Sequence, residues 1–120
     1  EHYDLIKEYK SIFISCGVHP EHINNSNVPS TNELTSLCSY NKVIGIGETG
    51  LDFYHSLEHK NFQYIAFERH IECSYETGLP LIIHQRNSEN EIIDVLQNYQ
   101  KESRRLHLKS AYMTLSPQTR

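Results

Sequence analysis

The sequence lacks tryptophan, has no apolar run long enough to cross a bilayer, and shows no excess of positive charge. It has 120 residues, with 11 lysines and arginines against 15 aspartates and glutamates, for a formal net charge of −4. This charge gives no sign of a basic surface made for nucleic acid, although bound metal ions can hold a phosphate without one. No signal peptide is recognisable, and we expect a cytoplasmic protein that does not associate with membranes.

Cysteine is also scarce. Cys16, Cys38 and Cys73 are odd in number, widely spaced and without a Cys-x-x-Cys pair, which is typical of reduced intracellular thiols rather than of a disulfide framework. The length suits one small domain, and the ordinary apolar content and mixed charge argue against disorder. Because the first residue is Glu1 and not methionine, we expect the sequence to be less than a complete gene product.

What the sequence does contain is an alternation of short apolar segments with longer amphipathic ones. The apolar segments predict β-strands over residues 12–18, 43–47 and 79–83, and a further short strand is expected over 104–108. Strands that are apolar throughout are typical of parallel sheets with covered faces. Because amphipathic segments separate these strands, we predict an α/β fold built on a parallel sheet.

Helix signals mark the segments between the strands. Ser30-x-x-Glu33 and Ser88-x-x-Glu91 have the form of capping boxes, and apolar residues at helical spacing follow each of them. A long amphipathic segment over residues 57–77 precedes Gly78, a helix stop, and Pro80, which blocks continuation. The predicted inner stripe of this helix is Phe62, Ile65, Ala66, Arg69 and Cys73.

Polar residues follow three of the predicted strands. His19, Glu48 and His84 each come directly after an apolar segment. Parallel strands bring their carboxyl ends to one edge of a sheet, where α/β folds place their chemistry. A carboxylate and imidazoles at one edge are ligands for a hard or borderline divalent metal ion. These residues therefore indicate a metal-dependent hydrolase.

The chemistry suggests roles for each residue. Two metal ions bridged by a carboxylate clamp a phosphate and activate water, and Glu48, with glycines nearby, suits the bridging position. His84 suits a terminal ligand, and Arg86 is placed to pair with a phosphate or to steady a carboxylate. Plainer interpretations stay open: a loop histidine at His84, a helix cap at Glu48, a turn at His19, and an N-cap or turn at Asp52. The histidines without a strand-end position are predicted to be surface or helix residues: His2, His22, His55, His59 and His70.

Three segments resemble the TatD family of metal-dependent deoxyribonucleases. They are GVHP (17–20), IGETGLDFY (46–54) and FERHIECSYETGLPLIIHQR (67–86), in the family's order and at similar intervals, and the resemblance spans about residues 15–91. It implies part of an amidohydrolase-like (β/α)8 TIM barrel, about three to four βα units. It also implies hydrolysis of DNA phosphodiester bonds with Mg²⁺ or a similar divalent ion, two ions being present in the complete family site.

The resemblance also assigns residues. The glutamate of the GE block and the histidine that ends the next strand are metal ligands in the family, which makes Glu48 and His84 the predicted catalytic and metal-binding residues. His107 is a third candidate ligand by its distance from His84, although the residues after it do not match the family's Cys-Phe-x-Gly turn. We ourselves assign substrate contact, or support of the ligands, to His19, Asp52 and Arg86. The residue after Arg86 is usually acidic in the family and is asparagine here, which puts a carboxylate partner of Arg86 in doubt.

The sequence has room for roughly half of a barrel of about 250 residues. The family's first-strand His-x-His pair and its late aspartate motif have no counterpart here. We expect a partial barrel domain over residues 1–108 and an irregular tail over 109–120, which reads like foreign sequence joined to a truncated domain. A partial barrel leaves sheet edges open, so we expect marginal stability and self-association, or pairing with a complementing chain. We also expect a shortage of metal ligands, because two ligands rarely bind a hard cation tightly.

Other interpretations compete with a DNase that binds DNA. One keeps the barrel and the metal but changes the substrate to another ester or amide. Another is a non-catalytic fragment from a truncated or split gene. An open flavodoxin-like domain fits the length, but it would need a glycine-rich phosphate loop that the sequence lacks, and it leaves Glu48 and His84 unexplained.

Overall fold

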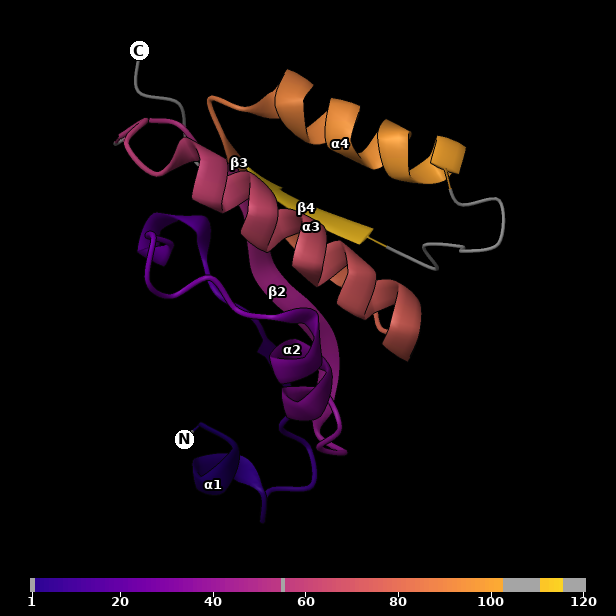
Figure 1. Cartoon of the computed structure of the whole chain (residues 1–120). Coiled ribbons are helices and arrows are strands. Elements are labelled where there is room, and N and C mark those ends of the chain that lie inside the picture. Colours follow the sequence, from indigo (N-terminus) through magenta and orange to yellow (C-terminus); the bar gives the residue numbers. More distant parts are fainter. Residues whose placement is uncertain (1, 55, 103–110, 116–120) are drawn as a thin grey trace.

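The computed structural model describes residues 2–54, 56–102 and 111–115, which form a four-stranded parallel sheet in the order β1-β2-β3-β4, with helices beside it (Figure 1). The strands are β1 (Ile14–Cys16), β2 (Val43–Asp52), β3 (Leu81–Arg86) and β4 (Ala111–Leu115). The helices are α1 (His2–Ile6), the 3-10 helix η1 (Pro20–His22), α2 (Thr31–Leu37), α3 (Lys60–Thr77) and α4 (Glu89–Glu102). The predicted α/β class and parallel pairing are confirmed.

The second and third strands extend beyond the ends predicted for them. Glu48 lies inside β2 and His84 inside β3, so the expectation that both follow their strands is wrong. The register between β2 and β3 shifts between Gly47 and Thr49, where β2 carries one residue more than its neighbour. A bulge of this kind takes a residue out of the regular ladder and re-aims its side chain. Glu48 is that residue.

The chain also forms a strand where the sequence predicts an irregular tail. Residues 111–115 are β4, which pairs in parallel with β3, so the expectation of irregular structure is wrong for these five residues. The segment AYMTL has residues that favour strands, and the edge of β3 supplies the backbone partners that such a short segment needs. The expected strand over 104–108 lies outside the described residues.

One apolar core joins the sheet to three helices. Its fully buried members include Leu34 of α2, Phe67 and Ile71 of α3, and Ile92 of α4. The strands contribute Val43, Ile46, Leu51, Leu81 and Ile83. α3 packs against β2 and α2, and in Figure 1 it crosses in front of the sheet. No helix in the described part of the chain is long and apolar enough to span a membrane.

The helix signals are confirmed in part. The Ser30 hydroxyl oxygen accepts from the Glu33 N–H at 3.1 Å, as the first capping box predicts. Gly78 ends α3 with a left-handed φ of 73°, and its N–H donates to the Ser74 carbonyl at 2.8 Å. At the second box, Ser88 directly precedes α4, and its carbonyl accepts from the Ile92 N–H at 2.9 Å. Its hydroxyl donates to the Leu51 carbonyl at 2.7 Å, which ties the start of α4 to β2.

The inner face of α3 is more polar than predicted. Ile65, placed on the predicted stripe, is 39% exposed, whereas Gln63 and His70 are buried. His70 is fully buried rather than at the surface: its Nδ1 lies 2.6 Å from the Ala66 carbonyl, and its Nε2 accepts from the Val18 N–H at 3.0 Å. Apolar spacing misses such residues because hydrogen bonds to backbone groups make their burial tolerable.

Burial makes His70 a source of pH-dependent stability. Burial lowers the pKa of His70, while its hydrogen bond to the Ala66 carbonyl acts in the opposite direction. Between the lowered folded pKa and the unfolded value of about 6.5, the unfolded chain binds more protons. The stability is therefore fully present above pH 6.5 and is lost as the pH falls, by at most about 1.4 kcal/mol per pH unit for this single group.

We therefore expect His70→Gln to flatten the pH dependence of unfolding. Urea denaturation at pH 7.5, 6.5 and 5.5 measures the slope for both proteins. The other histidines are present in both, so the difference between the two slopes belongs to His70. Equal slopes would mean that His70 keeps an ordinary pKa in the folded protein.

Candidate metal centre

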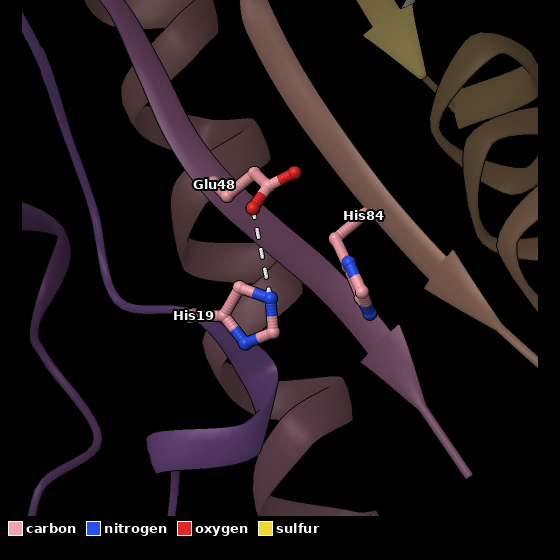
Figure 2. A group of neighbouring side chains, drawn as sticks. All are labelled: His19, Glu48 and His84. Atoms are coloured by element: carbon pink, nitrogen blue, oxygen red, sulfur yellow. Dashed lines mark ion pairs between the residues drawn. The ribbon is translucent and has the colours of Figure 1, made fainter. Parts of the chain in front are cut away.

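Three side chains from three segments of the fold meet beside β2 and β3, the two inner strands of the sheet. His19 precedes η1, Glu48 comes from the bulge of β2, and His84 comes from β3 (Figure 2). One donor atom of each side chain lies within 4.8 Å of the donor atoms of the other two. The structure thus brings together the residues that the sequence places after its apolar segments.

His19 faces Glu48 with a nitrogen that carries a proton. Its Nδ1 accepts from the Glu21 N–H at 3.1 Å, and because a backbone N–H only donates, the proton of the neutral ring is on Nε2. That Nε2 lies 3.6 Å from Glu48 Oε1. Burial, and secondly the nearby His84, lower the pKa of His19, while Glu48 and Glu21 act to raise it. The ring is therefore neutral near pH 7, with an N–H aimed at the carboxylate.

His84 is held by a buried carboxylate. Its Nε2 lies 2.9 Å from Asp52 Oδ2, and both residues are nearly inaccessible, at 5% and 2% exposure. A carboxylate accepts, so Nε2 carries the hydrogen and Nδ1 keeps its lone pair. The other oxygen of Asp52 accepts from the Tyr54 N–H at 3.1 Å. Asp52 therefore shapes the turn after β2 and also orients His84.

Comparison with known proteins decides the family. Residues 1–115 match the family model described as TatD related DNase. This chain belongs to that family. The resemblance found in the sequence is thereby confirmed, and the cluster around Glu48 occupies the segments that carry it.

Individual relatives agree with the TatD assignment. A protein of Buchnera aphidicola subsp. Baizongia pistaciae named as an uncharacterized metal-dependent hydrolase is 41% identical over 96 residues, which cover 78% of this chain and 35% of that protein. The Pantoea sp. protein named 3′-5′ ssDNA/RNA exonuclease TatD is 31% identical over 83 residues, covering 69% of this chain and 32% of that protein. The chain therefore spans about a third of the length of these relatives.

A solved structure supports the partial barrel. The crystal structure of the Escherichia coli TatD homologue YjjV matches with a TM-score of 0.68 and 21% identity, over 80% of this chain and 38% of that chain. At this identity the likeness concerns the fold alone. It confirms the prediction that the chain corresponds to part of a TatD-type TIM barrel.

The remaining candidates lie in different places. Arg86, the last residue of β3, stacks its guanidinium on the Tyr54 ring, with Cζ 3.6 Å from the ring centroid. His107 lies outside the described residues. A cavity of about 330 Å³ adjoins the cluster and is lined by Pro20, Glu21, His22, Ile23, Asp52, Ser56, His59 and Gln63. His22 and His59, predicted to be surface or helix residues, thus face this cavity.

Sequence reasoning missed two residues that support the cluster. Gln63 and His70 of α3 hydrogen-bond to backbone next to the site, the first at Asp52 and the second at Val18. Neither follows a strand, so the strand-end pattern does not mark them. The available signal was their spacing of i and i+7, which places both on one stripe of a helix that must face the sheet.

Proposed function

We propose that this TatD family chain is a metal-dependent hydrolase of phosphodiester bonds in nucleic acid, and of DNA in particular. The observation that carries the proposal is the meeting of the Glu48 carboxylate with His84 beside the two inner strands of a parallel sheet, with His84 backed by a buried Asp52. A ligating histidine usually gives its other ring N–H to such a carboxylate. The pair therefore matches the chemistry of a metal ligand better than that of an ordinary loop histidine.

The donor set fits a hard or borderline divalent ion such as Mg²⁺ or Mn²⁺. Glu48 supplies carboxylate oxygen, and His84 supplies Nδ1, because its Nε2 is engaged by Asp52. A bound ion supplies Lewis-acid polarisation of a phosphoryl oxygen and lowers the pKa of bound water. Two protein ligands are few for a hard cation, so we expect weak binding. His107 remains a candidate for a third.

The other residues position the substrate around these ligands. His19 directs its Nε2–H toward Glu48, where it can donate to the carboxylate or to a phosphate oxygen. Arg86 offers a planar cation beside the cluster, suited to a phosphate. The adjoining cavity of about 330 Å³ has room for a sugar or base next to the scissile phosphate.

The choice of nucleic acid as substrate rests on kinship and on charge. The Pantoea relative is named for action on single-stranded DNA and RNA, and the family description names a DNase. A chain with a formal net charge of −4 needs bound cations to hold a polyanion, which agrees with a metal-dependent mechanism. Self-association, or a complementing chain at the sheet edges, would supply further ligands.

The deciding experiment is a nuclease assay on single-stranded DNA, with Mg²⁺, Mn²⁺ or EDTA. We expect cleavage that EDTA abolishes and that Glu48→Gln lowers at least ~100-fold, the upper end of losses seen when a ligand's support alone is removed. Glu58→Gln is the matched control, because it makes the same chemical change on a side chain that is 77% exposed.

The other arms of the assay separate the alternatives. Size-exclusion chromatography of the same sample reports whether an active species is an oligomer. Single-stranded RNA and a panel of small esters and amides test other substrates. Cleavage of a small ester but not of nucleic acid would replace the proposal with a different hydrolase. A folded sample inactive on every substrate would refute it for this chain and favour a non-catalytic fragment.

A further inference from the structure

The inner face of α3 carries two buried polar side chains on one stripe. Gln63 is 5% exposed and His70 is fully buried, and their spacing of i and i+7 places them above one another along the helix. Gln63 uses both of its hydrogen bonds, and His70 one of its two, on backbone groups of other segments. Each of those segments supports a member of the metal cluster.

Gln63 holds the end of β2. Its Oε1 accepts from the Asp52 N–H at 2.8 Å, and its Nε2 donates to the Asp52 carbonyl at 3.1 Å. The side-chain amide therefore pairs with both backbone groups of one residue, as a neighbouring strand would. Because Asp52 Oδ2 is the partner of His84, fixing the Asp52 backbone also fixes the direction from which His84 is held.

His70 holds the segment that carries His19. Its Nε2 accepts from the Val18 N–H at 3.0 Å, so the hydrogen of the ring is on Nδ1, which donates to the Ala66 carbonyl. Val18 directly precedes His19, and His19 in turn caps η1 through Glu21. One ring thus anchors the loop between β1 and η1 to the middle of α3.

We infer that Gln63 and His70 are positioning residues of the metal centre, through which α3 sets the places of His84 and His19. The inference rests on the proposed function, which makes the cluster a metal centre. Its test does not need nuclease activity. The competing explanation is that both residues only satisfy buried backbone groups and stabilise the fold.

Each substitution should disturb its own histidine. Long-range proton–nitrogen NMR spectra of the metal-free protein report which nitrogen of each histidine carries the hydrogen. In the wild type we expect the ring hydrogen on Nε2 of His84 and His19, and on Nδ1 of His70. The centroids of the two rings lie 4.3 Å apart, so each substitution affects both sets of signals to some degree. Gln63→Leu should change the His84 signals more than those of His19, whereas His70→Leu should do the reverse.

Ser74→Ala is the matched control. Ser74 lies on the same face of α3, is 3% exposed and donates to the Leu79 carbonyl at 2.6 Å, so this variant loses a buried hydrogen bond away from the cluster. Ser74→Ala should lower the melting temperature and leave the NMR signals of His19 and His84 unchanged. In Mn²⁺ titrations, Gln63→Leu should weaken binding about 10-fold relative to this control, the size expected when the support of a ligand is lost.

Milder variants keep the test informative if the leucine variants do not fold. Gln63→Asn keeps a neutral amide but is shorter by one methylene, so it should lose its reach to the Asp52 backbone and still disturb His84. His70→Asn keeps an amide too short to reach Val18, so it should disturb His19, and His70→Gln, which is long enough, should restore the wild-type signals. The inference is overturned if the Gln63 and His70 variants fold and have lower melting temperatures, but their His19 and His84 signals and their Mn²⁺ affinity equal those of Ser74→Ala. An inactive protein that shows the expected signals would count against the proposed function alone.

Discussion

Replacing Glu48 by glutamine should remove measurable Mn²⁺ binding, with a loss of affinity of at least ~100-fold. The substitution keeps the size of the side chain but exchanges a charged oxygen ligand for a neutral amide, which a hard cation binds poorly. Glu48 also supplies the only carboxylate of the three-residue cluster found in the described part of the chain. Electron paramagnetic resonance of free Mn²⁺ during titration measures the affinity directly and needs no substrate.

The fold should survive this change, because Glu48 lies in a bulge and its side chain is 33% exposed. Circular dichroism melting of the same samples checks that point. Glu58→Gln should bind Mn²⁺ as the wild type does, since Glu58 lies outside the cluster. If both variants bound Mn²⁺ equally, Glu48 would not be a ligand and the metal centre would have to lie elsewhere.

The general fold was predictable because its signals are local. Apolar segments around Val43 and Leu81 predict strands, and Gly78 before Pro80 predicts the end of a helix, which it forms in the left-handed conformation. The alternation of such segments implies parallel pairing. Parallel pairing in turn places the segments that carry His19, Glu48 and His84 side by side, so their meeting followed from the order of the elements, although Glu48 and His84 lie within strands and not after them.

The details of the site depend on contacts between distant segments. The register shift at Glu48 arises between β2 and β3, and no pattern within β2 alone marks it. The burial of His70 depends on the Val18 N–H, far away in sequence, which offers the ring a partner. Likewise β4 forms where the edge of β3 provides hydrogen bonds. Propensity and periodicity describe neighbours in sequence, so they do not reveal such features.

The supports of the cluster show how the proposed ligand His84 is held in place. His84 is oriented by Asp52, whose backbone is held by Gln63, and all three are buried. A buried polar network of this kind fixes one geometry only if its members are satisfied. The geometry of the cluster therefore depends on α3 as well as on the strands that carry Glu48 and His84.

Gly50→Ala should be strongly destabilising, at about 3 kcal/mol or more, from backbone strain and overpacking together. Gly50 has a φ of 142°, which side-chain-bearing residues rarely adopt, and an added Cβ would overlap the carbonyl oxygen of His84. That oxygen belongs to the backbone of the neighbouring strand, so no change of rotamer relieves the overlap. The displacement would fall on His84 itself, and Mn²⁺ affinity should fall with stability.

Gly45→Ala on the same strand separates this effect from the general cost of replacing a glycine. There the nearest atom to an added Cβ is the Ile82 Cδ1 at 3.2 Å, the end of a side chain that can move. We expect less than about 1 kcal/mol of destabilisation and unchanged Mn²⁺ affinity. Urea denaturation measures the free energy of unfolding of both variants. An insoluble Gly50→Ala variant beside a soluble Gly45→Ala variant would agree with the prediction. Two variants of equal stability would show that β2 and β3 can separate at Gly50, and that the close approach of their backbones is not what places His84.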